Sequence, residues 1–196
     1  AEPSSAPRDM ALGTASGRKP AAPSGTAFRA ACESDVRFFH VLYASTRAEE
    51  LAATSWPPEA IDRFLAQQAA AQHAHYARHY AGAGWWVLER RREPIGRLIL
   101  ARWPGNHRIV DIALLPEARG HGLGTAIVAD VIAEADAAGA KVSIHVEKAN
   151  PVMRLYRRLG FVPVEDKGVY DLLERTANHP GSPRGGSTAV PGEALS

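Results

Sequence analysis

The chain has a single cysteine, Cys32, among its 196 residues. One cysteine can form neither a disulfide within the chain nor a cysteine-based zinc site, which favours a reducing compartment. The sequence also lacks an unbroken apolar run long enough to cross a bilayer, so we expect no membrane partner. The segment Ala1–Met10 has no basic stretch followed by an apolar one, which indicates no secretory signal. We therefore expect a cytoplasmic protein.

There is little net charge. The 23 Lys and Arg residues nearly balance the 21 Asp and Glu residues, which leaves +2 with neutral histidine. A protein that binds nucleic acid through a general basic field needs a much larger excess, so we expect no nucleic-acid partner. The hydrophobic fraction of 45% is sufficient for the core of one ordinary globular domain.

The two ends of the chain differ in composition from its middle. Residues 1–26 and 177–196 consist almost wholly of Ala, Pro, Ser, Gly and Thr with a few charges. Such segments have no periodic apolar face whose burial could offset the loss of backbone entropy on folding. We expect two disordered tails around one folded domain at residues 27–176.

Within that domain, the spacing of apolar residues predicts alternating strands and helices. We expect strands at residues 28–32, 85–90, 95–103, 107–115, 141–147, 161–164 and 169–173, and helices at 35–46, 55–80, 123–138 and 151–159. Because most of the strands are joined by short turns, this order predicts the α+β class, with helices packed on a mixed sheet.

The most informative motif is R-G-H-G-L-G-T, between a predicted strand and the first turn of a predicted helix. It comprises Arg119, Gly120, His121, Gly122, Leu123, Gly124 and Thr125. Glycines allow successive backbone N–H groups to face one anion, and the helix N-terminus adds partial positive charge. Arg119 adds a full charge. The motif predicts a pyrophosphate site, and a tight turn with glycines for packing is the alternative.

Two common phosphate motifs fit poorly. A P-loop requires a lysine at the helix start, and none is present. For a dinucleotide site, Glu147 does end the next predicted strand, but the spacing is G-x-G-x-G rather than G-x-G-x-x-G. The loop also follows antiparallel strands. An NAD-dependent enzyme is therefore a distant alternative.

Two strings in the same order carry a family resemblance. The first is I-A-L-L-P-E-A-R-G-H-G-L-G at residues 112–124, and the second is N-P-V-M-R-L-Y-R-R-L-G-F at 150–161. Together with the turn at 93–96, they resemble the GNAT superfamily of acetyl-CoA-dependent N-acetyltransferases, over about residues 27–174. The resemblance implies a mostly antiparallel twisted sheet with a splayed strand pair and helices on both faces. It also implies acetyl-CoA as acyl donor and an amine acceptor, without a metal.

The same resemblance implies contacts with the donor. In the family, the pantetheine arm pairs with the backbone of the strand before the loop, here Ala113, Leu114 and Leu115, and the loop holds the pyrophosphate. Asn150 is similar to a family residue near this arm, although five residues separate it from Tyr156, one fewer than in the commonest pattern. Tyr156 matches the tyrosine that protonates the departing thiolate. It also falls on an apolar helical stripe, so a core role is the alternative.

An amine acceptor must also lose a proton, and two side chains are candidates for taking it. Asp111 is a carboxylate in an otherwise apolar strand, where strict alternation puts it on the face of Ile109 and Ala113. The alternative is a structural pair with a neighbouring arginine. His145, on the next strand, is the second candidate because imidazole titrates near neutrality.

The acceptor itself is an unidentified primary amine of a small molecule or peptide. Gln68 and Gln72 fall on the inward stripe of the helix at 55–80, where we expect them to line its site. A catalytically silent acyl-CoA-binding or interaction module of the same fold is the alternative function, and a homodimer stays open.

Overall fold

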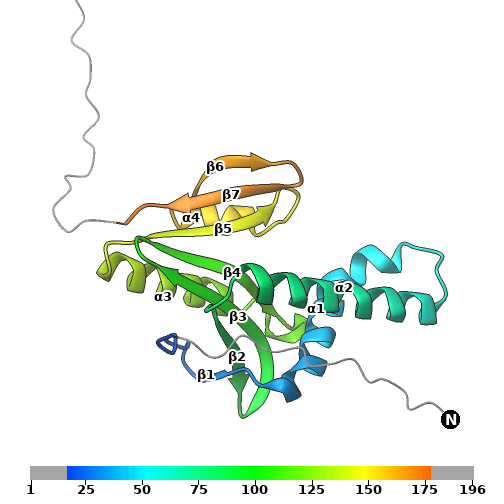
Figure 1. Ribbon diagram of the computed structural model, residues 1–196. Coiled ribbons are helices and arrows are strands. Elements are labelled where there is room, and N and C mark those ends of the chain that lie inside the picture. The colour runs from blue at the N-terminus through cyan, green and yellow to red at the C-terminus, as the bar shows by residue number, and fades with distance from the viewer. Residues whose placement is uncertain (1–16, 178–196) are drawn as a thin grey trace, which may run out of the picture.

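The computed structural model describes residues 17–177, which form a seven-stranded sheet with helices on both faces (Figure 1). The strands are β1 (Ala27–Ala30), β2 (Gly84–Arg90), β3 (Glu93–Trp103), β4 (Asn106–Leu114), β5 (Lys141–Glu147), β6 (Val162–Lys167) and β7 (Tyr170–Arg175). The helices are α1 (Val36–Ala52), α2 (Pro58–His79), α3 (Leu123–Ala137) and α4 (Met153–Arg158), with short 3-10 turns η1 (Glu33–Asp35) and η2 (Pro116–Ala118).

The predicted tails fall mainly outside the described part of the chain, at residues 1–16 and 178–196. Residues 17–26, which the composition assigns to the first tail, lie against the domain. Pro20 is buried, and Ala22 packs on the hydrophobic core. Among residues 17–177, no helix combines the length and the apolar character that a membrane span requires.

The sheet has the order β1-β2-β3-β4-β5-β7-β6, and its only parallel neighbours are β4 and β5. Their pairing is short, because it joins Asn106–Ile109 to Lys141–Ile144 and then stops. β4 stays paired with β3 as far as Leu114. The two strands therefore separate, and from Val110 to Leu114 the β5-facing edge of β4 has no strand partner. This splayed pair confirms the expected fold.

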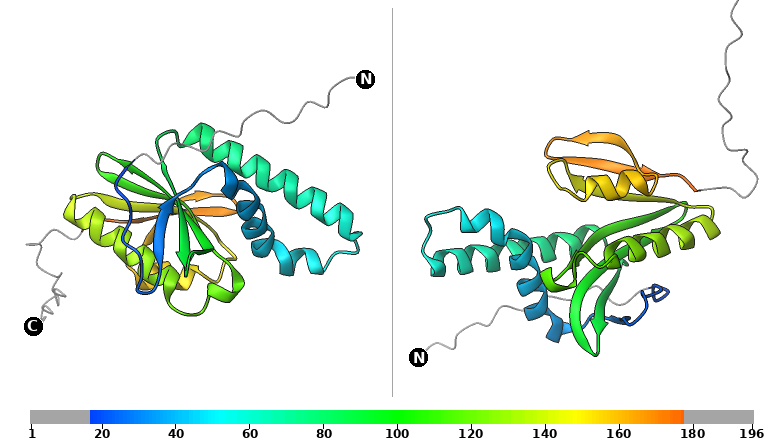
Figure 2. Two further views of the ribbon diagram at one scale, coloured as in Figure 1. Left: turned by 90° about the horizontal axis from the view of Figure 1, so that it is seen from below. Right: turned by 180° about the vertical axis from the view of Figure 1, so that it is seen from behind.

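Two hydrophobic clusters cover the two faces of the sheet. On one face, α3 and α4 pack against the sheet through a cluster that includes Leu98, Ile109, Ile127, Val131 and Tyr156. On the other face, Phe39 of α1 and Tyr76 of α2 pack on Trp85 and Ile99. Figure 2 shows α3 on one side of the sheet and the α1–α2 pair on the other. α2 extends well past the edge of the sheet, so one part of it has no strand beneath it.

A β-bulge in β4 overturns the expected alternation of side chains. Leu100 pairs with Ile109 but Ile99 pairs with Asp111, so Val110 is an extra residue. Asp111 therefore shares the face of Ile99, toward α1 and α2, and Ile109 faces α3. The prediction that Asp111 shares a face with Ile109 is wrong, because one inserted residue reverses the side-chain period of two.

The β2–β3 connection is a tight two-residue turn. Its residues are Arg91, with φ 53°, and Arg92, with φ 67°. Both are exposed, and both are in the left-handed region, where residues other than glycine, asparagine and aspartate are disfavoured.

Candidate active site

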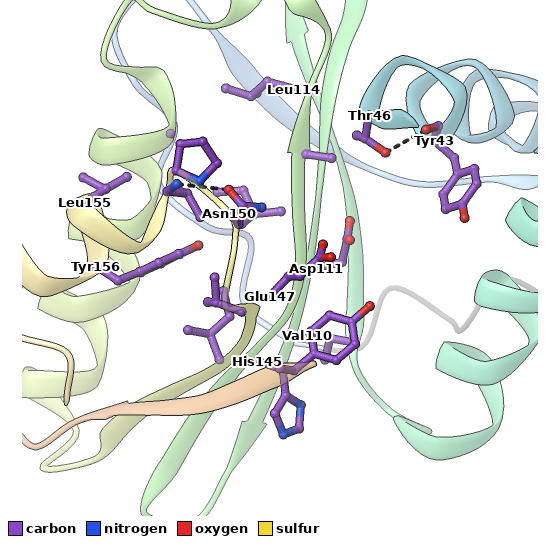
Figure 3. Close-up of a pocket in the computed structure, with 18 of the residues that line it drawn as sticks. Tyr43, Thr46, Val110, Asp111, Leu114, His145, Glu147, Asn150, Leu155 and Tyr156 are labelled. Atoms are coloured by element: carbon purple, nitrogen blue, oxygen red, sulfur yellow. Dashed lines mark hydrogen bonds between the residues drawn. The ribbon is translucent and has the colours of Figure 1, made fainter. Parts of the chain in front are cut away.

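A cavity of about 880 Å³ opens where β4 and β5 separate (Figure 3). Its floor is the splayed part of the two strands. One wall comes from α3 and α4, and the opposite wall comes from α1, α2 and the start of β7. The cavity therefore reaches both faces of the sheet, which an unbroken sheet would keep apart.

The free edge of β4 forms one side of the cavity, where Ala113 and Leu114 line it. Leu115 is turned back into the sheet, because its N–H donates to the carbonyl of Ile95 at 2.9 Å. Gly96 allows the close approach of β3 and β4 here. A Cβ on Gly96 would lie 2.7 Å from the carbonyl oxygen of Ala113 and 2.6 Å from Leu114 Cδ2.

The glycine-rich loop adopts the conformation that the motif predicts. Gly120 and Gly122 have φ of 77° and 75°, and Gly122 is the N-cap of α3. The first intrahelical bond runs from the N–H of Ala126 to the carbonyl of Gly122, so the N–H groups before it lie at the helix end. Such groups suit an anion. Because these two glycines have no side chains, a pyrophosphate can approach the backbone N–H groups at the helix start closely.

The loop residues fall into three groups. Arg119 and Gly124 line the cavity. Gly120, His121, Gly122 and Thr125 are exposed at the surface beside it, and Leu123 is buried in the core under α3. Leu123 thus anchors the helix start, and its backbone N–H remains the group available to a phosphate.

Arg119 has partners of its own. Its Nε donates to the carbonyl of Leu114 at 2.8 Å, and its Nη2 lies 3.3 Å from Ser45 Oγ in α1. The guanidinium therefore bridges the end of β4 and α1 at the mouth of the cavity. Arg119 is exposed, so its guanidinium is also accessible to an anion from solution.

Asn150 lies in the turn between β5 and α4, exposed at the cavity wall. Its Oδ1 accepts a hydrogen bond from the N–H of Val152 at 3.0 Å. This bond shapes the start of α4 and uses the amide oxygen, so the amide nitrogen can still donate to another group. Its contact with a donor stays a prediction.

The position of Tyr156 is compatible with both of the roles that the sequence left open, a core residue and a group that faces the donor. Its ring is 2% exposed and packs edge-on against Phe161, with centroids 5.3 Å apart. Its hydroxyl is directed into the cavity (Figure 3). Burial, and secondarily the charge of Asp111, raises the pKa of the phenol above its usual range. Tyr156 therefore holds its proton at neutral pH.

Asp111 carries the arginine partner that the alternative interpretation anticipated. Arg97 Nε donates to its carboxylate at 2.9 Å, and Arg97 Nη2 donates to Gln72 Oε1 at 3.1 Å. The guanidinium is 4% exposed and lies 5.0 Å from the ring of Phe39. This cluster joins α1, α2, β3 and β4. Gln72 lines the cavity as expected, but Gln68 is exposed and does not line it, because the buried position of that turn of α2 is the next residue, Ala69.

His145 lines the cavity from β5, at its exposed edge. Partial burial of its ring lowers the pKa of the imidazole, and the positive charges of Arg108 and Lys167 lower it further. The ring is therefore mainly neutral at pH 7 and able to accept a proton.

Sequence reasoning missed several cavity residues. Tyr43 and Tyr76 line the cavity, yet in the sequence both fall on apolar helical stripes, which are typical of core residues. Burial raises the pKa of Tyr76, as does the charge of Asp111. Glu147 also lines the cavity, although the sequence singled it out only as the acidic residue at the end of a strand that a dinucleotide site would use. Among residues 17–177, no three His, Cys, Asp or Glu side chains lie together as metal ligands would.

A splayed strand pair, a glycine-rich helix start beside it and a cavity-facing tyrosine on the following helix define the class as an acetyltransferase fold. The family model of the acetyltransferase (GNAT) family matches residues 43–161. The chain belongs to this family.

Solved structures show the same fold at low sequence identity. PaiA N-acetyltransferase from Thermoplasma acidophilum, solved with coenzyme A, has a TM-score of 0.59 and 13% identity, covering 77% of this chain and 98% of that one. RimL, a ribosomal L7/L12 α-N-protein acetyltransferase solved with coenzyme A, has a TM-score of 0.56 and 17% sequence identity. The match covers 82% of this chain and 98% of RimL. YncA from Salmonella typhimurium, solved with acetyl-CoA, has a TM-score of 0.51 and 20% sequence identity. The match covers 82% of this chain and 98% of YncA. No curated protein matches the sequence.

Proposed function

We propose that the protein transfers an acetyl group from acetyl-CoA to a primary amine of a small molecule or peptide, by direct attack in a ternary complex. The observation that carries this proposal is the free edge of β4 from Val110 to Leu114, which lies in one cavity with Tyr156 and beside the α3 loop. The CoA and acetyl-CoA complexes of the structural relatives support the choice of donor.

The residues present fit this donor. The β5-facing edge of β4 beside Ala113 and Leu114 suits an extended amide-bearing arm, which would pair with it like an added strand. The carbonyl of Leu114, which Arg119 Nε binds, would be one of the acceptors on this edge. The start of α3, from Gly120 to Thr125, suits the pyrophosphate, with Arg119 as the neighbouring cation. When bound, acetyl-CoA supplies an activated thioester carbonyl.

The chemistry requires one proton to leave the amine and one to reach the sulfur. The amine nitrogen attacks the carbonyl carbon, a C–N bond forms and the C–S bond breaks. Tyr156 donates a hydrogen bond or its proton to the departing thiolate. Transfer from a phenol to a thiolate is uphill by about 2 kcal/mol with ordinary pKa values of about 10 and 8.5. Burial makes Tyr156 less acidic still, so hydrogen bonding is its main contribution.

The amine proton passes to a group on the opposite side of the cavity, where Asp111 and His145 are the two predicted acceptors. The acceptor molecule lies between α1, α2 and the start of β7. Tyr43, Gln72, Tyr76 and Tyr170 line this part, which suits a substrate with both apolar and hydrogen-bonding groups.

Calorimetric titration with acetyl-CoA and then CoA tests the donor, with NADH as the comparison ligand. Thiol release with phenethylamine, 1,4-diaminobutane and alanyl-alanine tests transfer. We expect saturable binding of both CoA species and turnover of at least one amine. Gly122→Glu should abolish binding by adding a side chain and a negative charge at a left-handed position. Binding without turnover would identify a silent acyl-CoA-binding module, and absence of binding would overturn the proposal.

A further inference from the structure

β5 ends on a carboxylate that the roles described so far leave unused. Glu147 is the last residue of β5 and lines the cavity, half-buried. It shares the face of His145, whereas Val146 between them is buried toward α3. Its backbone is held on both sides, by pairing with Tyr170 of β7 and by the N–H of Asn150, which donates to its carbonyl at 2.9 Å. The side chain therefore starts from a well-fixed position.

The other carboxylates of the cavity have a cation beside them. Arg97 binds Asp111 at 2.9 Å, and Arg47 binds Glu50 at 2.8 Å. A bound guanidinium occupies lone pairs of the carboxylate, which leaves fewer of them for an incoming ammonium group.

Glu147 differs from both. Its chain neighbour Lys148 pairs with Asp166 at 2.7 Å, on the β6–β7 hairpin. Within residues 17–177, neither an ion pair nor a hydrogen bond engages the carboxylate of Glu147. It is therefore the cavity carboxylate that is open to a cation from solution.

The position of Glu147 suits an incoming ammonium group. Figure 3 draws its carboxyl group in the cavity, between the labelled side chains of Tyr156 and Asp111. The other titratable side chains that line the cavity are Tyr43, Arg47 and Glu50 from α1, Tyr76 from α2, Asp111 from β4, Arg119 from the α3 loop, His145 from β5, Tyr156 from α4 and Tyr170 from β7. Of the two cations among them, Arg47 pairs with Glu50 and Arg119 donates to the carbonyl of Leu114. Burial and nearby charge hold Tyr76 and Tyr156 in their neutral forms and favour neutral His145, so none of these three neutralises Glu147.

We propose that Glu147 binds the ammonium group of the acceptor and takes its proton, an assignment that rests on the proposed N-acetyl transfer. The Glu147 carboxylate accepts one proton from the ammonium and returns it to solvent after the product leaves. The neutral amine attacks the thioester carbonyl, the C–N bond forms and the C–S bond breaks, and the second proton of the nitrogen passes to the departing thiolate, to which Tyr156 donates a hydrogen bond. Asp111 is then a positioning residue, which with Arg97 and Gln72 fixes α2 against β4.

The test is Glu147→Gln, assayed by thiol release across pH 6–9 with whichever panel amine the wild type turns over fastest. Glu59→Gln, an exposed carboxylate at the start of α2, is the matched control. We expect kcat/KM of Glu147→Gln at neutral pH to fall about 100-fold or more, the usual contribution of a general base. The affinity for acetyl-CoA should be unchanged. The log of kcat/KM for this variant should rise linearly with pH up to the pKa of the amine, because it uses only amine already neutral in solution.

Three results would overturn the assignment. Wild-type rates in Glu147→Gln would remove Glu147 from the reaction. A raised KM with unchanged kcat and pH profile would make it a binding residue only. The linear pH profile in Asp111→Asn instead, with Glu147→Gln unaffected, would move the role to Asp111.

The proposed function can fail separately. Acetyl-CoA binding by the wild type without turnover of any amine would overturn both the transferase function and this assignment. Should Glu147→Gln lower the melting temperature, Glu147→Asp provides a second variant. It keeps the carboxylate, so it should retain the wild-type pH profile at a reduced rate.

Discussion

Tyr156 has its ring in the core and its hydroxyl in the cavity, so the two parts of the side chain can be tested separately. Tyr156→Phe keeps the ring and its contact with Phe161. We predict a fall in kcat of about 10-fold or more, since hydrogen bonding to the leaving group is lost. The affinity for acetyl-CoA measured by calorimetry should stay within about twofold, because the substitution leaves the free edge of β4 and the α3 loop intact. Unchanged kcat would mean that the hydroxyl takes no part in the reaction.

Arg97 and Asp111 form a largely buried pair, with side chains 4% and 16% exposed, whose two members depend on each other. Arg97→Met leaves the carboxylate without its cation, and we predict a loss of about 3–5 kcal/mol in the free energy of unfolding. The double variant Arg97→Met, Asp111→Asn removes both charges and should recover most of that loss. Urea denaturation of the wild type, both single variants and the double variant measures the coupling. If the losses of the two single variants simply add up in the double variant, the interaction between Arg97 and Asp111 contributes little to the free energy of unfolding.

At the scale of elements, the approach of β3 to β4 depends on Gly96. Its missing Cβ leaves room for the carbonyl of Ala113 and the side chain of Leu114. We predict that Gly96→Ala displaces the end of β4, destabilises the protein by about 1–3 kcal/mol as overpacking does, and weakens acetyl-CoA binding. Calorimetry and thermal denaturation measure the two effects. A loss of stability with unchanged affinity for acetyl-CoA would show that the cavity-facing side of β4 stays in place when its β3-facing side is displaced.

Element positions were the part of the fold most readily predicted from sequence. β5 occupies the predicted residues, and α3 starts at the predicted Leu123, because alternating apolar residues and a glycine-rich start are local signals. The end of α1 was placed six residues early, at residue 46 rather than Ala52, since the sequence there carries no stop signal. The bulge at Val110 has no local signal either, because it depends on the register with β3.

The site residues that could be predicted from the sequence are those that lie in contiguous motifs. The α3 loop and Tyr156 lie in contiguous strings, whereas the partner of Asp111 comes from β3 and is fixed only by strand register. Tyr43 and Tyr76 resemble core residues in sequence. Their place in the cavity depends on how far β4 and β5 separate, which is a property of the folded sheet.

At the scale of the whole molecule, the strands β5–β7 join the rest of the sheet through only a short parallel pairing. A ligand bound between β4 and β5 would contact both parts of the sheet and so stabilise the native state. We predict that acetyl-CoA at about 100 times its Kd raises stability by about 2.7 kcal/mol and Tm by about 5–10 °C. NADH should give no shift. Scanning fluorimetry measures both, and equal shifts would favour the dinucleotide alternative.

The turn at Arg91 and Arg92 makes the β2–β3 hairpin a site for engineering thermal tolerance. Each left-handed arginine costs about 1–2 kcal/mol relative to a residue suited to that conformation. Replacing the pair with Asn-Gly, the dipeptide preferred in such turns, should therefore raise Tm and speed hairpin closure during refolding. Stopped-flow refolding and calorimetric scans would measure these gains, and a Tm at or below that of the wild type would show that the arginines compensate through contacts of their own.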